Sequence, residues 1–226
     1  MDYQIVLFFA LILSLILSVY AQIKVNSSFK KYSRVGSQSG MTGYEVAKLI
    51  LDRNGIYDVN VQQVGGSLTD HYDPRSKVVR LSENVYGSTS IAAVSVAAHE
   101  VGHAIQDNEA YGFLRFRTLL APVASFVSRF VYILLFAGFM FEIMRLVDIA
   151  IIMFTVAVLF QVITLPVEFN ASRRAMNNLD AYGLVSTDEY KSSRRVLSAA
   201  ALTYVAATTV SLINLLRLIA LRGSRD

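Results

Sequence analysis

The sequence predicts a mainly helical protein that crosses a membrane several times and carries a small α+β lobe. Hydrophobic residues make up 54% of the 226 residues, and the mean hydropathy is +0.46, which is more than one soluble core needs. Two polar regions, about 22–119 and 166–198, interrupt the apolar sequence. We therefore expect one membrane-embedded domain over residues 1–226, in which the two polar regions together form the lobe.

Four apolar segments are long enough to cross a bilayer as helices, which takes about 20 residues. They cover about 5–21, 122–141, 146–165 and 199–216. The first resembles a secretory signal, but the residues before it include the acid Asp2 and no base. We therefore expect a retained anchor. Residues 142–145 alone separate the second and third segments, which predicts an antiparallel helical hairpin. Arg129 lies within the second segment, where it can snorkel to the membrane surface, pair, or face a polar cavity.

The lobe begins with a helix and two strands. Thr42 and Glu45 form a capping box that predicts a helix over about 43–53, which Asn54-Gly55 should end. Residues 59–64 and 77–81 have the composition of short strands. Residues typical of turns lie between them, which suggests a small hairpin.

A second lobe helix is expected from a cap at Ser88 to about Gln106, because the segment is rich in Ala and Val and contains no Pro. It carries His99-Glu100-Val101-Gly102-His103. Residues four apart share a helix face, so His99 and His103 can bind one ion. Glu100 lies one step round the helix, where it can take a proton from a water on that ion. Small neighbours such as Gly102 keep this helix slim, which suits either close approach to the site or tight helix packing.

A catalytic zinc ion has three protein ligands and one open position. We expect Glu168 to be the third ligand, because two predicted membrane spans separate it from His103 and so place both on one side. As an alternative, Glu168 is an acid at a helix N-terminus, where the macrodipole favours it. A longer zinc pattern would need Gly at 106 and His at 109, but the chain has Gln106 and Glu109.

Three further side chains are candidates for contact with substrate. His71 could orient substrate, stabilise an oxyanion or bind metal, or it could simply lie on the surface. Tyr72 and Arg173 are candidate contacts for a scissile carbonyl. If 77–81 is an edge strand, an extended peptide could add to it through main-chain hydrogen bonds.

Four stretches of the chain resemble the YugP-type neutral zinc metallopeptidases of bacterial membranes. These are residues 68–75 (LTDHYDPR), 77–82 (KVVRLS), 99–106 (HEVGHAIQ) and 168–172 (EFNAS), and the resemblance extends over nearly the whole chain. It implies a multi-pass membrane protein assigned as a peptidase, with His99 and His103 as ligands and Glu100 as the catalytic residue. We expect the small lobe to be zincin-like and to hold one catalytic zinc ion. The last stretch is also similar, more distantly, to an element of HtpX- and CAAX-processing-type peptidases. There the Glu is the third ligand, and an Asp usually stands where this chain has Ser172.

Two functions remain open. The leading one is hydrolysis of peptide bonds in membrane or membrane-proximal proteins by a zinc-dependent endopeptidase, with Glu100 as general base. The alternative is a membrane scaffold or complex subunit that keeps a structural zinc, although such a site has no use for a base. A transporter is less favoured, since the ionisable residues lie mainly outside the apolar spans.

The expected partners are a peptide or protein substrate and the lipid bilayer, and the chain could also associate with a membrane protein or with copies of itself. The net charge of +4 does not indicate nucleic-acid binding, because the basic residues cluster beside the apolar spans. That distribution predicts a catalytic lobe in the cytoplasm. Arg217, Arg222 and Arg225 would then lie outside after four crossings, so three crossings with a surface-lying last helix remain an alternative.

Overall fold

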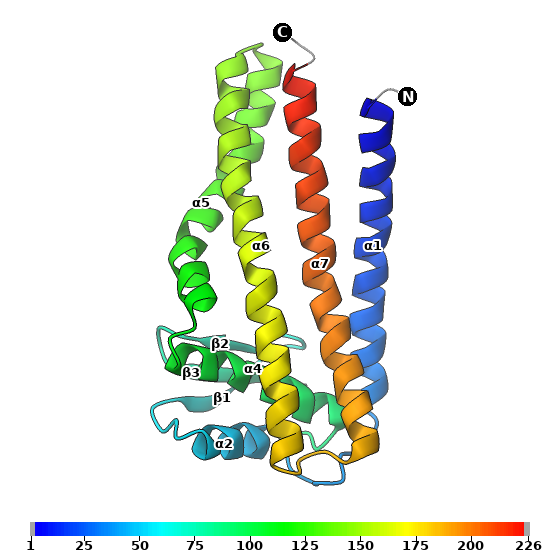
Figure 1. Cartoon of the computed structure of the whole chain (residues 1–226), viewed down its shortest axis with the longest axis vertical. Coiled ribbons are helices and arrows are strands. Elements are labelled where there is room, and N and C mark those ends of the chain that lie inside the picture. The colour runs from blue at the N-terminus through cyan, green and yellow to red at the C-terminus, as the bar shows by residue number, and fades with distance from the viewer. Residues whose placement is uncertain (1–2, 224–226) are drawn as a thin grey trace. The chain divides into compact units, whose positions relative to one another are not determined.

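The computed structural model describes residues 3–223, so Asp2 and Arg225 lie outside the described residues. The elements, all but α3 labelled in Figure 1, are α1 (Tyr3–Tyr32), α2 (Gly43–Arg53), β1 (Asn60–Val64), β2 (His71–Asp73), β3 (Val78–Ser82), α3 (Glu83–Tyr86), α4 (Ile91–Asn108), α5 (Gly112–Met140), α6 (Met144–Ala181) and α7 (Thr187–Gly223). In the described part of the chain, α1, α5, α6 and α7 are long and apolar enough to cross a membrane. The prediction of a mainly helical chain with four candidate spans is confirmed.

The chain divides into two compact units. Unit 1 contains the described parts of Met1–Ala21, Arg115–Leu165 and Thr203–Asp226, and unit 2 contains Gln22–Leu114 and Pro166–Leu202. That residues of about 22–119 and 166–198 form a catalytic lobe stays a prediction.

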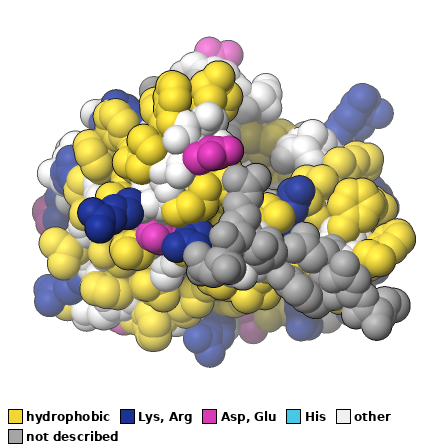
Figure 2. All heavy atoms as spheres, turned by 90° about the horizontal axis from the view of Figure 1, so that it is seen from above, with side chains coloured by type: hydrophobic (Ala, Val, Ile, Leu, Met, Phe, Trp, Pro, Cys, Tyr) yellow, Lys and Arg dark blue, Asp and Glu magenta, His cyan; other side chains and the backbone are white. Residues whose placement is uncertain are grey.

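Unit 1 is helical. The predicted hairpin is present, with α5 ending at Met140 and α6 starting at Met144. A shared apolar core joins the two helices, formed by Val127, Val131, Leu135, Val147, Ala150, Phe154, Ala157 and Val158. Arg129 is exposed on α5, which is compatible with snorkelling. The face seen from above in Figure 2 is largely hydrophobic, with scattered charged side chains between.

Unit 2 holds a three-stranded sheet in the order β1-β3-β2, in which β1 runs parallel and β2 antiparallel to β3. The predicted hairpin between 59–64 and 77–81 is therefore wrong. The reason is β2, only three residues long, which occupies the antiparallel position beside β3. Since β3 is the central strand, the condition under which a peptide could add to it is not met.

Helices α2 and α4 frame the core of unit 2. Helix α2 has the predicted bounds, and both halves of its Thr42–Glu45 capping box are formed. Helix α4 begins two residues later than predicted, because its cap is Ser90 and the Ser88 hydroxyl donates to the Ser90 hydroxyl instead. The core includes side chains from α2, β3, α4 and α6, among them Ile50, Leu81, Val94, Val101 and Leu179.

Helix α6 passes through Pro166 without a break. Proline removes one backbone donor, and membrane helices tolerate that loss when neighbouring groups compensate for it. Glu168 therefore lies well inside a helix, and its interpretation as an acid at a helix N-terminus is wrong.

Candidate metal centre

Three predicted ligands converge in unit 2. His99 and His103 project from α4 and Glu168 from α6, with one ligand atom of each within 4.8 Å of the others. The Glu168 Oε2 atom lies 3.3 Å from His99 Nε2 and 3.6 Å from His103 Nε2. Two donors bound to one tetrahedral zinc ion at about 2.1 Å are about 3.4 Å apart. The donor types and the two distances to Glu168 therefore fit zinc.

Glycine at position 102 permits this convergence. A Cβ atom on Gly102 would lie only 2.6 Å from the carbonyl oxygen of Ala171 on α6. Because His99 and His103 flank Gly102 on α4, and Ala171 follows Glu168 by one turn of α6, the close backbone contact sets the distance between the ligands. The sequence left two roles open for the small residues of this helix, tight helix packing and close approach to the site. At Gly102 both apply, because the packing of α6 against α4 is what brings Glu168 to the histidines.

A buried amide orients the imidazole of His103. Its Nδ1 atom lies 3.0 Å from Gln106 Oε1. The Gln106 amide nitrogen donates to the Val167 carbonyl at 2.8 Å and to Asn170 Oδ1 at 2.9 Å, so its oxygen is the acceptor for the imidazole. His103 then carries its proton on Nδ1 and presents the Nε2 lone pair, as a metal ligand must. Sequence reasoning missed this role, although a glutamine three residues after a predicted ligand shares its helix face and is a usable signal.

The imidazole of His99 is held by Ser172, whose hydroxyl lies 3.2 Å from His99 Nδ1. The hydroxyl oxygen can accept the Nδ1 proton, which leaves Nε2 directed at Glu168. A neutral hydroxyl thus occupies the place where the resemblance implies an aspartate. It orients the ring without adding a negative charge.

The support of His103 continues to the surface. Asn170 Oδ1 also accepts from Arg174 Nε at 2.7 Å. The two terminal nitrogens of Arg174 donate to both carboxylate oxygens of Glu109, at 2.9 and 2.6 Å, and this contact lowers the pKa of Glu109. Glu109 is the C-cap of α4. A bidentate pair of this kind therefore ties the end of α4 to α6 beside the ligands.

The carboxyl group of Glu100 is buried, with the residue 8% exposed. Burial raises its pKa to about 7, the charges of Glu168 and Asp70 act in the same direction, and His99 and the backbone N–H of Tyr72 oppose them. A carboxyl group with a pKa near neutrality can both accept and donate a proton.

Asp70 is a site neighbour that sequence reasoning did not single out. Its carboxylate accepts from the Ser82 backbone N–H at 2.7 Å and from the Ser82 hydroxyl at 3.0 Å, and burial raises its pKa. These bonds fix the start of β2 against the end of β3. The segment is thereby held where the Tyr72 backbone N–H lowers the pKa of Glu100.

The three candidate substrate contacts are not part of the metal-ligand group. His71 is exposed, its Nδ1 donates to the Thr69 carbonyl at 2.8 Å, and its Nε2 faces Arg80 at 3.4 Å. The hydroxyl of Tyr72 donates to Asp107 at 2.8 Å, and the phenol's pKa is raised by burial and by that bond. Arg173 is exposed on α6.

Comparison with known proteins gives two matches of long coverage. A family model described as "Putative neutral zinc metallopeptidase" matches residues 7–223. A protein of Bacillus subtilis (strain 168) named "Putative membrane protease YugP" is 53% identical over 211 residues, which cover 93% of this chain and 94% of that protein. No solved structure matches the chain.

Proposed function

The chain belongs to the neutral zinc metallopeptidase family, and from that premise we propose that it is an integral membrane endopeptidase in which His99, His103 and Glu168 hold one zinc ion. The resemblance to YugP-type proteins is confirmed. The observation that carries the proposal is the meeting of these three ligand side chains beside the buried carboxyl group of Glu100.

The proposed chemistry needs a metal and a base. Zinc bound at this site would polarise a substrate carbonyl and lower the pKa of a water molecule. Glu100 would accept a proton from a water molecule held there and later donate it to the leaving amine nitrogen. The backbone N–H of Tyr72 supports this cycle, since it stabilises the charged carboxylate while burial stabilises the neutral acid.

Unit 2 is the proposed catalytic lobe, a small zincin-like arrangement built on the motif helix α4. Its sheet supports a peptide substrate, because β2 is an edge strand and its Tyr72 side chain is bonded to Asp107 of α4. An extended peptide can add to such an edge. Lys24, Lys30 and Lys31 follow the first apolar span, so we place the lobe in the cytoplasm. Substrates are then membrane proteins or proteins close to the membrane.

The competing function is a scaffold that keeps zinc for structural reasons. Structural zinc sites are usually closed by four protein ligands. Within the described residues, the group of side chains that could hold a metal ion has three members. A buried Glu100 with a raised pKa has no use in such a site, which favours the enzyme.

The test compares wild type with Glu100→Gln, each purified in detergent, for bound zinc and for cleavage of a denatured casein-like substrate. The matched control is Glu83→Gln, which makes the same change at an exposed glutamate of α3 outside the ligand group. We expect about one zinc per chain in all three proteins, and a loss of cleavage of at least about 100-fold in Glu100→Gln alone. Equal cleavage by wild type and Glu100→Gln would refute the role of the base. Retained zinc without cleavage of any membrane or soluble protein would favour the scaffold.

A further inference from the structure

A second site of unit 2 has a charge pattern that the peptidase does not use. It is a cavity of about 490 Å³ lined by Lys24 of α1 and by residues 191–202 of α7, within the size range of ligand sites. Its lining includes four cations, Lys24, Lys191, Arg194 and Arg195, and within the described residues no carboxylate lines it. A cavity with this lining favours an anion.

The lining changes character along α7. Lys191, Arg195, Ser198 and Leu202 line the cavity at steps of four, three and four residues, which places them on one face of the helix. That face therefore passes from cationic through a hydroxyl group to aliphatic. The aliphatic end enters the apolar segment 199–216, so the preferred ligand is amphiphilic as well as anionic.

Helix α1 repeats this order. Lys24 comes three residues after the apolar segment 5–21. On both helices, then, the cations lie next to the end of an apolar segment long enough to cross a membrane. Basic side chains at such positions meet lipid headgroups.

The cations are available to a ligand. All four are exposed. Arg195 donates to the hydroxyl of Tyr32 on α1 at 3.3 Å, which fixes its direction without cancelling its charge. Lys191 is 3.9 Å from Asp188, but these side chains are 71% and 98% exposed, so solvent screens the pair. The nearby Glu189 is buried and accepts from the backbone N–H groups of Gln38 and Ser186.

We propose that this cavity binds the headgroup of an anionic phospholipid. The phosphate lies among Lys191, Arg194 and Lys24, and an acyl chain follows Ala199 and Leu202. Guanidinium and ammonium groups bind phosphate through charge-assisted hydrogen bonds, and basic pockets beside membrane helices are a known type of lipid site.

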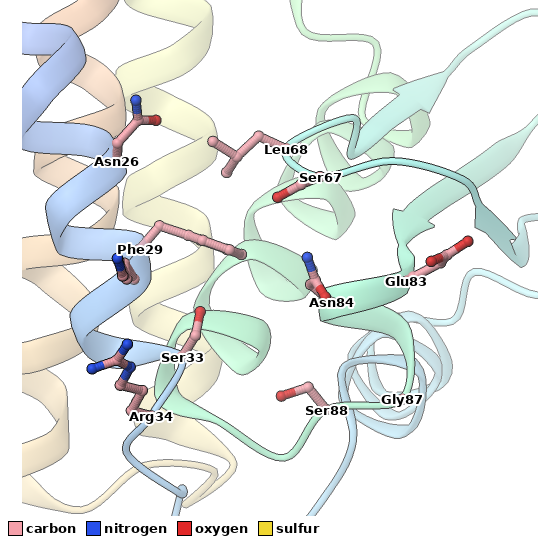
Figure 3. Close-up of a pocket in the computed structure, with 11 residues that line it drawn as sticks. Asn26, Phe29, Ser33, Arg34, Ser67, Leu68, Glu83, Asn84, Gly87 and Ser88 are labelled. Carbon is pink, nitrogen blue, oxygen red and sulfur yellow. The ribbon is translucent and has the colours of Figure 1, made fainter.

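Another cavity of unit 2 provides a comparison. It has a volume of about 720 Å³ and is lined by residues of α1, α3 and the loops around them (Figure 3). Its cations are Lys30 and Arg34, but Glu83 also lines it. With half the number of cations and a carboxylate, it is the weaker anion site, and its two basic residues serve as a matched control.

The experiment measures lipid binding by the full-length, zinc-loaded protein in neutral detergent micelles. Short-chain phosphatidylglycerol, short-chain phosphatidylcholine and inorganic phosphate are titrated separately, and binding is followed by thermophoresis. The test variant is Lys191→Gln/Arg194→Gln and the control is Lys30→Gln/Arg34→Gln. A third variant, Ser198→Phe, fills the cavity and keeps all four cations. Equal zinc content and unfolding midpoints show that each variant is folded.

We expect phosphatidylglycerol to bind at least about 10-fold more tightly than phosphatidylcholine, since each basic residue near a lipid phosphate strengthens binding several-fold. Lys191→Gln/Arg194→Gln should weaken that binding by about 10- to 30-fold. Ser198→Phe should weaken it comparably, and Lys30→Gln/Arg34→Gln by less than about 3-fold. Equal losses in the test and control variants would show a general charge effect and overturn the proposal. Equal affinity for inorganic phosphate, or for the two lipids, would overturn it as well. If Lys191→Gln/Arg194→Gln does not fold, retained lipid preference in Ser198→Phe is sufficient to overturn it.

Discussion

Replacement of Gly102 by alanine tests how the candidate metal centre is assembled. The added Cβ would lie 2.6 Å from the carbonyl oxygen of Ala171, whereas ordinary contacts begin at 3.4 Å. Because the obstacle is backbone, no side-chain rotation relieves it. Helices α4 and α6 must therefore separate locally by about 0.8 Å, the difference between the two distances.

The same displacement acts on the ligands. The distances from Glu168 Oε2 to the two imidazoles, now 3.3 and 3.6 Å, would grow to about 4.1 and 4.4 Å. Two donors on a tetrahedral zinc ion are about 3.4 Å apart, so the displacement would draw Glu168 away from an ion held by the two imidazoles. We therefore expect Gly102→Ala to lower zinc affinity by about 10- to 100-fold, the range found when residues supporting a ligand are lost.

The effect on folding should be smaller. Overpacking costs about 1–3 kcal/mol, but alanine is favoured over glycine inside a helix by about 1 kcal/mol. The net loss in the free energy of unfolding of metal-free protein is then about 0–2 kcal/mol.

The assay is competition for zinc with a fluorescent chelator, together with thermal unfolding in excess chelator. Gly112→Ala is the control, because a Cβ there meets nothing within 4 Å. Wild-type zinc affinity in Gly102→Ala would refute the view that this backbone contact positions the ligands.

Three further predictions concern side chains around the metal. Gln106→Ala removes the acceptor for the His103 imidazole, so zinc affinity measured with the same chelator should fall about 10- to 100-fold. In the folded state the pKa of Glu100 is about 7, against a usual value of about 4.5 in the unfolded chain. The free energy of unfolding therefore falls as the pH rises from about 4.5 to 7. Metal-free wild type should thus lose up to about 3 kcal/mol of unfolding free energy relative to Glu100→Gln over that range, and parallel pH profiles would contradict this. Tyr72→Phe breaks only the bond to Asp107 and should cost about 1 kcal/mol in chemical unfolding with zinc content unchanged; a fall in kcat/KM beyond about 100-fold would instead mean that the hydroxyl contacts the transition state.

Local signals predicted the helical part of the fold well. Both residues of the capping box, Thr42 and Glu45, lie within the same short segment, so the signal does not depend on the rest of the chain. Helix α2 has the expected bounds. Membrane spans are readable for a similar reason, since the length of an apolar run is a property of the run alone.

Pairing of strands could not be predicted in the same way. β2 is three residues long, too short for an alternation of polar and apolar residues to be recognised. It nevertheless takes the antiparallel position beside β3 and leaves β1 to pair in parallel. Turn signals near Gly65 and Asp73 mark where the chain bends, but they do not say which strands become neighbours.

The pairing of His99 and His103 could be predicted because the two residues share one helix face at a fixed spacing, and their role as metal ligands stays a proposal. The place of Glu168 inside a helix was not, because Pro166 usually indicates a helix boundary and here does not form one. Whether a proline interrupts a membrane helix depends on compensating partners that lie elsewhere in the chain.

The source of the proposed third ligand, Glu168, links metal binding to helix packing. In the longer zinc pattern, position 109 would supply a histidine just beyond the same helix, whereas here Glu109 binds Arg174 of α6 and Gln106 bonds across to Val167 and Asn170. The residues that rule out the longer pattern thus hold α4 against the helix that carries Glu168. Since the three ligands meet only when these helices are packed, zinc at 100 times its Kd should stabilise the fold by about 2.7 kcal/mol. That is comparable to the penalty expected for Gly102→Ala, so zinc at 100 times the variant's own Kd should raise its unfolding midpoint to at least that of metal-free wild type, while its affinity stays low.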